Sequence, residues 1–374
     1  MSKMYWREVI LSTPFLKDLY VKHRSKTTND LMNTSELENY LSAAEKVILD
    51  HPVNIVVGVV KDEDSYADMG LVKERAYYPK YERFLENNNI AYDYYDPLLS
   101  DWIEQAKKFD LILWHTSSDP SMQEIAEGKI FILEQMGKKC LPSYNEVWSY
   151  ENKIRASYLY KLHNLPSIPT FISHSKSETL SYLEKTKLPL ISKISTGSAS
   201  YGVDKIDNLD QAKKIVNQVF SHKGKETYFK YSHQKDYVYF QEFIEDATYD
   251  LRVMCVGNEF FGYYRYPNKG DFRASGAGNY EKKEIPVEAL ELAFKVREMF
   301  DSTFLATDFV YSEKLKNFLI IESSIFIGVD SCEQLSVGGI AGKYVRHAEN
   351  QYEFVKGKFW VQELTLKNII EKNF

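Results

Sequence analysis

The sequence predicts a protein of two parts, a parallel α/β layer in the front half of the chain and an α+β region behind it. In residues 51–142 short apolar runs alternate with helical stretches, a pattern that is typical of a parallel sheet. From about residue 143 the pattern changes, and hairpins with short polar turns follow. The 374 residues are enough for more than one domain and a substantial hydrophobic core.

The front half begins after an N-terminal extension, residues 1–50. The expected strands and helices then alternate in the order strand 54–60, helix 71–88, strand 90–96, helix 101–109, strand 110–116 and helix 122–137. We expect Pro79 to interrupt the first of these helices. No GxGxxG motif follows the first strand, so we reject a dinucleotide site in this layer.

The back half contains longer stretches of paired strands. The expected elements are a helix from 151 to near 166, a strand at 188–195, a loop at 195–202, a strand at 203–206, a helix at 208–222 and a strand at 237–244. A hairpin is expected about Gly257-Asn258, a favourable pair for a tight turn. Pro286 then opens a helix that runs to about Asp301, and a last hairpin covers 305–324.

Composition narrows the class of protein. The net charge is −6 and no dense Lys/Arg cluster occurs, which argues against nucleic acid as the main partner. Three cysteines, Cys140, Cys255 and Cys332, form no CxxC motif, a usage that fits a reducing compartment. Charges interrupt the N-terminal residues throughout, so we expect neither a signal peptide nor a membrane span, and we expect a cytoplasmic protein.

Each strand of the last hairpin carries one carboxylate, Asp308 or Glu322. If the strands pair about Leu315, these two residues lie opposite each other on one face. Like charges in that position destabilise a hairpin, and a divalent cation removes the penalty. Oxygen ligands favour Mg²⁺. The alternative is that each carboxylate meets an Arg or Lys of another strand, and the hairpin alone leaves both interpretations open.

Two loops of the back half have a composition that favours the binding of anions. The loop STGSASYG, residues 195–202, follows the strand that contains Lys193, and its Gly and Ser residues allow close backbone approach to a phosphate. It is not a P-loop, and an ordinary surface turn can look the same. Arg273 lies in the loop GDFRASGAGNY, where a guanidinium and backbone amides can hold a phosphate or an oxyanion; the alternative is an ordinary mobile loop.

The segment QEFIEDATYDLRV, residues 241–253, combines a strand end with alternating charges. Glu242 ends a strand, and the following Phe243 and Ile244 can flank a planar ring. Asp250 and Arg252 alternate with apolar residues, so both face one side. The alternative for this pair is a surface ion pair of small energetic value.

The order of these signals, from about residue 110 to 325, resembles the ATP-grasp superfamily. The chain is most similar to the branch of D-alanine–D-alanine ligase, glutathione synthetase and RimK-like glutamate ligases, with QEFI and DFRASGAG as the closest local matches. The resemblance implies a pre-ATP-grasp α/β domain at 51–142. It also implies an ATP-grasp domain at 143–374, made of two α+β subdomains that clasp ATP, with a lid at about 170–240.

The resemblance also implies which residues hold ATP. Lys153 and Lys193 would bind the phosphates, under a lid loop that contains Gly197, Ser198, Ala199, Ser200 and Gly202. Glu242, Phe243 and Ile244 would present their backbone to adenine, and Glu245 or Asp250 would contact the ribose. Arg252 and Arg273 would be catalytic, binding the γ-phosphate and the acyl-phosphate or tetrahedral intermediate. Asp308, Glu322 and Ser324 would bind two Mg²⁺ ions, or Mn²⁺.

The chain departs from the family pattern near the metal strand. Ser324 stands where the family usually has the Asn of Glu-x-Asn, and Ser275 stands where the RimK-like branch often has Asn. The proline that usually follows Glu-x-Asn is missing. These changes affect the affinity for metal and the acceptor pocket.

The expected reaction is that of an ATP-dependent ligase. A carboxylate is activated as an acyl phosphate, an amine attacks it, and an amide, ADP and phosphate result. Two alternatives are an ATP-grasp kinase and an inactive ATP-binding regulatory protein, and Ser324 favours the second of these. The expected partners are small-molecule, glycan or peptide carboxylates and amines, with a homodimer as a candidate assembly.

Overall fold

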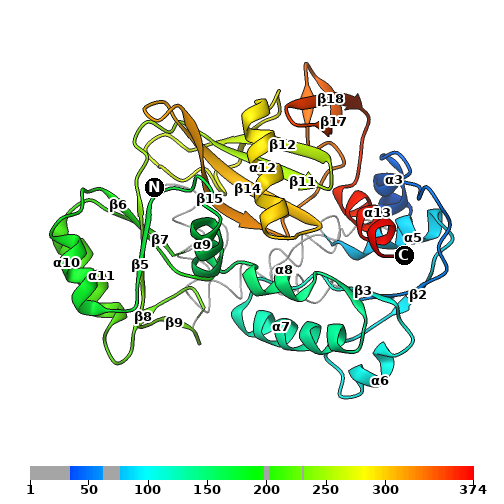
Figure 1. The fold of residues 1–374 in the computed structure, drawn as a ribbon, viewed down its shortest axis with the longest axis horizontal. Helices are drawn as coiled ribbons and strands as arrows, with labels where there is room; N and C mark the ends of the chain where they lie inside the picture. The colour runs from blue at the N-terminus through cyan, green and yellow to red at the C-terminus, as the bar shows by residue number, and fades with distance from the viewer. Residues whose placement is uncertain (1–33, 62–75, 198–201, 230) are drawn as a thin grey trace.

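The computed structural model describes residues 34–61, 76–197, 202–229 and 231–374 (Figure 1). The predicted lid-loop residues Ser198, Ala199 and Ser200, and most of the predicted N-terminal extension, lie outside the described residues. The first described helix is α3, Thr34–Ser42. Among the described residues, no helix combines the length and the apolar content that a membrane span requires.

The front of the chain forms a four-stranded parallel sheet, as predicted. Its strands, in the order in which they lie side by side, are β2 (Ala91–Tyr94), β1 (Val56–Val59), β3 (Leu111–Leu113) and β4 (Lys139–Leu141). The helices between them are α5 (Tyr78–Asn87), α6 (Trp102–Ala106) and α7 (Pro120–Gln135).

The prediction that Pro79 interrupts a helix was wrong. Pro79 lies in the first turn of α5, where a missing backbone N–H costs no hydrogen bond and the fixed φ favours helix initiation. The proline therefore marks the start of the helix.

The second sheet is antiparallel and has helices on it, at the left of Figure 1. Its order is β5 (Thr170–Ser173), β10 (Val238–Glu242), β6 (Leu190–Lys193) and β7 (Val203–Ile206). Two helices, α10 (Lys176–Leu183) and α11 (Leu209–Val219), contribute apolar side chains to a small core that this sheet completes. A short hairpin, β8 (Lys225–Glu226) and β9 (His233–Gln234), extends from it.

The third sheet is the largest. It has the order β15 (Asn317–Ser324), β14 (Phe304–Ser312), β11 (Asp250–Val256), β12 (Glu259–Tyr266), β17 (Ile340–Ala348) and β16 (Ser336–Val337), while β13 (Asn279–Glu281) pairs with β12 and β18 (Gln351–Lys356) with β17. The predicted turn at Gly257-Asn258 joins β11 to β12. The predicted helix after Pro286 is α12, Val287–Met299. Together with α13 (Val361–Asn373), α12 adds apolar residues to the main core of the molecule.

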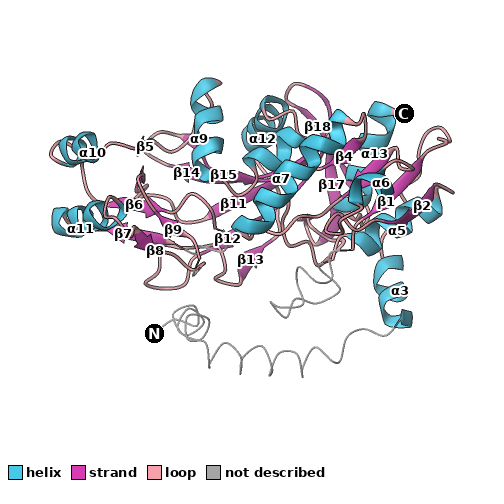
Figure 2. Cartoon of the chain, turned by 90° about the horizontal axis from the view of Figure 1, so that it is seen from below, coloured by secondary structure: helices cyan, strands magenta, loops and turns pink. Residues whose placement is uncertain are grey.

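The chain passes from the front sheet to the second sheet through two helices, α8 (Tyr144–Ser149) and α9 (Lys153–Leu162), which are both labelled in Figure 1; Figure 2 shows α9 from another side. After α9 the chain is hydrogen-bonded to β15: the Ile320 N–H donates to the Pro166 carbonyl over 2.9 Å, and the Ile168 N–H donates to the Ile320 carbonyl over 3.1 Å. The entry to the second sheet is thus attached to the last hairpin.

Candidate functional site

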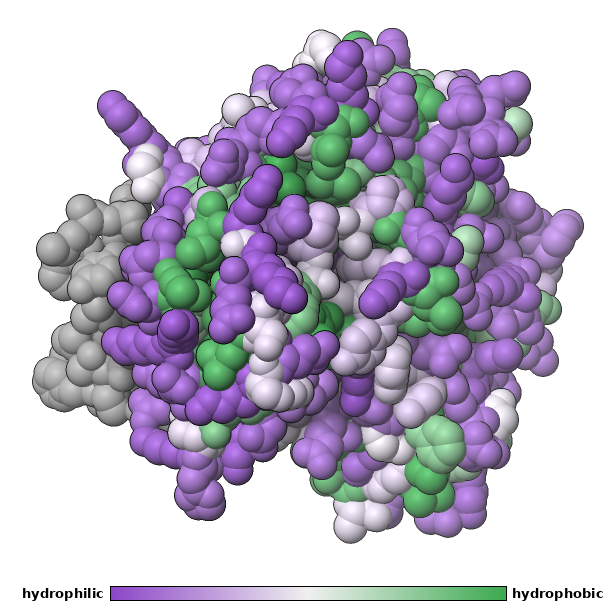
Figure 3. All heavy atoms as spheres, turned by 60° about the vertical axis from the view of Figure 1, so that its left-hand side comes forward, coloured by the Kyte–Doolittle hydropathy of each residue, from purple (hydrophilic) through white to green (hydrophobic). Residues whose placement is uncertain are grey.

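Two adjoining cavities lie against the third sheet. The smaller, of about 360 Å³, has walls from β6, from β10 with the segment that follows it, from the 271–275 loop and from the last hairpin. The larger, of about 690 Å³, is bounded by residues of α9, β11, β14 and β15 and by the segment after β3. Both cavities share one wall, formed by Lys153, Arg265, Ser275, Asp308, Ile321 and Glu322. On the face drawn in Figure 3 hydrophilic residues predominate, with scattered apolar patches between them.

Most of the predicted nucleotide residues lie around the smaller cavity. These are Lys153, Lys193, Gly197, Glu242, Phe243, Ile244, Asp250, Arg273, Asp308 and Glu322. Arg252 and Ser324 instead line the larger cavity alone. Glu245 is exposed, and neither it nor Gly202 lines either cavity.

The two predicted phosphate-binding lysines come from different elements. Lys193 is the last residue of β6, and Lys153 is the first residue of α9, after the N-cap Asn152; both side chains are buried. The backbone N–H of Lys153 donates to the Ser195 carbonyl over 2.9 Å, and its ammonium donates to the Gly197 carbonyl. The start of α9 is therefore bonded to the loop that follows β6.

The charge states of the two lysines differ. Burial lowers the pKa of Lys193 to about 8, although the Glu322 carboxylate opposes the shift. For Lys153 burial acts in the same direction, but the carboxylates of Glu322 and Glu151 outweigh it and raise the pKa. Lys153 is thus a firmly charged group, whereas the charge of Lys193 depends on pH near neutrality.

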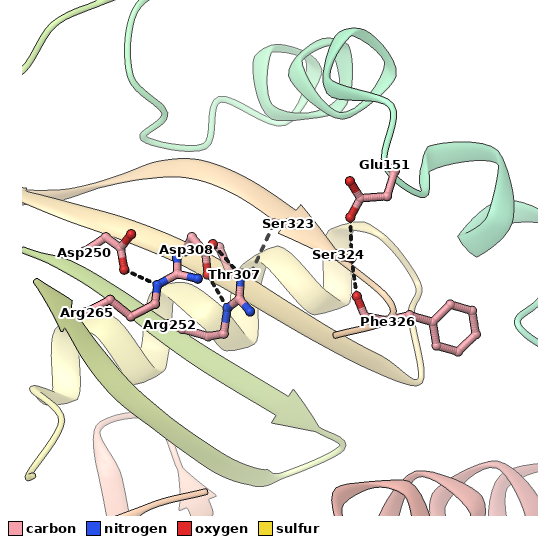
Figure 4. A network of polar contacts seen from close by, with 9 residues as sticks. All are labelled: Glu151, Asp250, Arg252, Arg265, Thr307, Asp308, Ser323, Ser324 and Phe326. Carbon is pink, nitrogen blue, oxygen red and sulfur yellow. Dashed lines mark hydrogen bonds and ion pairs between the residues drawn. The ribbon is translucent and has the colours of Figure 1, made fainter. Parts of the chain in front are cut away.

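A network of two arginines and two aspartates lies beneath the shared wall (Figure 4). The Arg252 guanidinium donates to both Asp308 oxygens over 2.7 Å, and Arg265 donates to Asp308 Oδ2 over 2.5 Å and to Asp250. Strand register explains the network, because Arg252 lies opposite Asp308 on β14 and Asp250 lies opposite Arg265 on β12. Burial would raise the pKa of Asp308, but the two guanidinium groups hold it well below its usual range.

The predicted pairing of the last hairpin is confirmed: Asp308 lies opposite Glu322. Each carboxylate also meets a cation from elsewhere in the fold, as in the alternative left open by the sequence. Asp308 meets the two arginines, and Glu322 Oε2 lies 3.6 Å from the Lys153 ammonium. The Ser324 hydroxyl lies 2.6 Å from the Phe326 carbonyl and 3.2 Å from a Glu151 oxygen.

The carboxylates of the shared wall could hold a hard cation together with phosphate oxygens. Glu322 and Asp308 both line the shared wall, and their carboxylate oxygens are suitable Mg²⁺ ligands. In the described ranges, no group of three or more His, Cys, Asp or Glu residues could hold a metal ion. A cation at this wall would therefore depend on ligands from a bound phosphate chain.

The 271–275 loop faces the segment after β10 across the smaller cavity. Arg273 is held inside this loop, because its backbone N–H and its guanidinium both donate to the Asp271 carboxylate. The ring of Phe272 meets that of Phe243 edge-on, with 5.9 Å between ring centroids. The two segments thus bring an arginine and two aromatic rings to one cavity.

Sequence reasoning missed two residues of the site, Arg265 and Glu151. Arg265 could have been found, since counting outward from the Gly257-Asn258 turn places it opposite Asp250. Glu151 precedes the N-cap of α9 and lines the larger cavity. Burial raises its pKa to about 7, with Lys153 opposing the shift. Nothing in the local sequence indicates that this side chain reaches β15.

Comparison with curated proteins finds two ligases. The chain is 32% identical over 198 residues to the α-aminoadipate–LysW ligase LysX of Saccharolobus solfataricus, an alignment that covers 51% of this chain and 67% of that protein. It is 25% identical over 196 residues to the ligase of the same name from Sulfurisphaera tokodaii, covering 51% of this chain and 65% of that protein. The chain thus spans about two thirds of the length of these relatives. No family model matches it.

Solved structures show the same fold. D-alanine–D-alanine ligase from Bacillus anthracis complexed with ATP superposes with a TM-score of 0.52 at 14% identity, covering 85% of this chain and 96% of that one. The D-cycloserine synthetase DcsG superposes with a TM-score of 0.52 at 11% identity. The chain therefore belongs to the ATP-grasp carboxylate–amine ligases, which use ATP to join a carboxylate to an amine as an amide.

Proposed function

We propose that ATP binds in the smaller cavity, that the carboxylate and the amine meet in the larger one, and that the reaction takes place at their shared wall. The observation that carries this proposal is the composition of the wall: Lys153, Arg265, Asp308 and Glu322 line both cavities. Charged groups at a junction can act on the transferring phosphoryl group and on the acyl group that receives it.

In this proposal the smaller cavity binds the nucleotide from three sides. Lys193 and Lys153 hold the phosphates, together with the loop that contains Gly197. The backbone of Glu242 to Ile244 faces the adenine, and the rings of Phe243 and Phe272 lie beside it. The Asp250 carboxylate holds Arg265 in place, since it already accepts a hydrogen bond from that guanidinium.

Glu322 and Asp308 are the residues that we propose to hold Mg²⁺ with the phosphates. A bound Mg²⁺ would neutralise charge on the phosphate oxygens as the γ-phosphoryl group is transferred. Asp308 keeps its position through Arg252 and Arg265, so its orientation is set before nucleotide binds. Ser324 lies on the side of the larger cavity, and we propose that it acts there on the substrate side.

The chemistry proceeds in two steps. A carboxylate oxygen attacks the γ-phosphorus, the bond to the bridging oxygen of ADP breaks, and an acyl phosphate forms. The amine nitrogen then attacks the acyl carbon, the C–N bond forms, the C–O bond to phosphate breaks, and the nitrogen loses a proton. In this proposal Arg273, which lines the smaller cavity, stabilises charge on the phosphoryl group, and Arg252, which lines the larger one, stabilises the oxyanion of the second step.

The substrates that we propose are small polar carboxylates and amines in a cytoplasmic setting. The larger cavity suits them, because its wall contains groups of both signs, including Arg252, Lys282, Glu151 and Asp330. The curated relatives are named for joining α-aminoadipate to LysW, which supports an amide-forming reaction over phosphorylation of a hydroxyl. The lysine, the arginine and the two carboxylates of the shared wall argue against an inactive regulator.

An ADP-release screen of carboxylates against amines, with the products identified by mass spectrometry, tests the function. We expect ADP and an amide with at least one pair, and we expect Lys193→Met to weaken binding of a non-hydrolysable ATP analogue. Lys187→Met, a change of the same kind outside both cavities, is the matched control. A phosphorylated product without an amide would identify a kinase. ATP binding without turnover in any combination would favour the regulator.

A further inference from the structure

Glu151, which precedes α9, lines the larger cavity and points toward Ser324 at the end of β15 (Figure 4). One oxygen of its carboxylate lies 3.2 Å from the Ser324 hydroxyl, and the same hydroxyl lies 2.6 Å from the Phe326 carbonyl. A hydroxyl has one proton, and the carbonyl is the nearer acceptor. The Glu151 carboxylate therefore receives little hydrogen-bond support from the described residues.

The other carboxylates of this cavity are already engaged or lie at its margin. Asp308 accepts hydrogen bonds from two guanidinium groups. Glu322 lies in the wall shared with the smaller cavity, 3.6 Å from the Lys153 ammonium. Asp330 is exposed. Among these carboxylates, Glu151 differs in two ways. It lies inside the cavity, and the hydrogen bond described for it comes from a hydroxyl rather than from a cation.

The backbone at Glu151 also sets it apart. Its φ is 49°, in the left-handed region that residues with a side chain seldom adopt. The next residue, Asn152, caps α9 through its side chain, so the chain turns sharply at this point. This backbone conformation places the Glu151 side chain in the wall of the larger cavity.

We propose that Glu151 binds the amine substrate as its ammonium ion and positions it for the second step, in which one ammonium proton passes to the Glu151 carboxylate before the nitrogen attacks; this inference rests on the proposed ligase function. An ammonium group supplies the charged donors that this carboxylate lacks. Glu151 lines only the larger cavity, away from the smaller one that would hold the phosphates. An amine bound there occupies the same cavity as Arg252 and adjoins the shared wall, where the acyl group would form.

The proposal predicts that a simple ammonium ion binds at Glu151. The probe is n-propylamine, which is protonated at pH 7, titrated by saturation-transfer NMR into protein with Mg²⁺ and a non-hydrolysable ATP analogue. We expect millimolar binding to the wild type and no comparable binding of n-propanol, its neutral counterpart. Glu151→Gln should weaken binding by about tenfold or more, because it keeps the shape and removes the charge. Glu151→Asp should restore part of it.

Asp330→Asn is the matched control, since it removes another carboxylate of the same cavity, and we expect it to change the affinity less than about twofold. Calorimetric titration should show that Glu151→Gln binds the ATP analogue as the wild type does. Three results would overturn the proposal: no binding of n-propylamine to the wild type, equal binding by Glu151→Gln, or loss of binding in Asp330→Asn alone.

A role of Glu151 in metal binding would also overturn the proposal, and it has a separate readout. Electron paramagnetic resonance of Mn²⁺ with the nucleotide would then show weaker metal binding in Glu151→Gln, whereas we expect no change. If the wild type failed to bind the ATP analogue, the proposed function would be contradicted. The probe titration on the nucleotide-free protein would still decide the role of Glu151.

Discussion

The side chain of Lys193 changes its charge within a pH range in which binding can be measured. Burial lowers its pKa to about 8, so in the free protein it is an ammonium below this pH and loses its proton above it. Phosphates bind the ammonium form, which means that affinity is full below about pH 8 and falls as the pH rises through it. The limiting slope is about tenfold for each pH unit.

Calorimetric titration with a non-hydrolysable ATP analogue between pH 7 and 9.5 checks this expectation. Lys193→Arg is the control, because a guanidinium keeps its charge across the whole range. Its absolute affinity will differ, but we expect its pH dependence to be flatter. A wild-type affinity that is constant from pH 7 to 9.5 would contradict the assignment of Lys193 to the phosphates.

Arg265 should be important for stability as well as for the site. It is buried and donates to Asp250 and Asp308, so Arg265→Met leaves two buried carboxylates with one partner fewer. Loss of one member of a buried ion network costs about 3–5 kcal/mol. Lys107→Met, which breaks an exposed pair with Glu104, should cost about 1 kcal/mol or less. Urea unfolding followed by circular dichroism measures the free energy of unfolding of both variants. Equal decreases in this free energy would contradict the prediction.

At the scale of elements, β11 and β12 approach closely at Gly262. A Cβ added there would lie 2.3 Å from the Arg252 carbonyl oxygen and 2.8 Å from Ile285 Cδ1. Because the nearest atom is backbone, Gly262→Ala must push the strands apart under the arginine network, at a cost of about 1–3 kcal/mol. Gly128→Ala, in α7 with no atom within 4 Å, should instead stabilise by about 1 kcal/mol. Thermal unfolding of the two variants should move in opposite directions.

Elements whose signals are local could be predicted from the sequence. The turn at Gly257-Asn258, the helix after Pro286 and the pairing of Asp308 with Glu322 each follow from a short stretch of chain, and all are confirmed. The contacts of the two arginines with Asp308 could not be predicted, because they depend on β14 lying beside β11 rather than beside the strand that precedes it in sequence. Contacts between distant segments leave no local pattern.

At the scale of the whole molecule, Glu146 joins the α8 segment to the start of the β14 hairpin. Its buried carboxylate accepts hydrogen bonds from the Ser143 N–H and from the Thr303 N–H over 2.8 Å. It also lies 2.7 Å from the Ser302 hydroxyl, which is 2.6 Å from the Phe304 carbonyl. Glu146→Ala removes a helix cap and leaves the part-buried N–H groups of Ser143 and Thr303 without this acceptor. We expect a loss of about 2–4 kcal/mol in the free energy of unfolding.

Chemical denaturation measures this loss, and Glu127→Ala, which removes a part-exposed carboxylate, is the control. Binding of the ATP analogue to the folded Glu146→Ala protein should change little, because Glu146 lines neither of the two cavities of the site. A stability equal to that of the wild type would mean that the two segments are held together by packing alone.

The hydrogen bonds that attach residues 166–168 to Ile320 have a mechanical consequence. A body held along one line can rotate about that line, and its points move in proportion to their distance from it. The attachment lies two residues from Glu322, so this carboxylate sits close to the axis, whereas β8, β9 and α11 lie at the far end of the lever arm. Swinging of the second sheet would break the hydrogen bond from Tyr231, between β8 and β9, to Asp119 at the start of α7. It would open the nucleotide cavity at its rim and leave the carboxylates of the last hairpin nearly still.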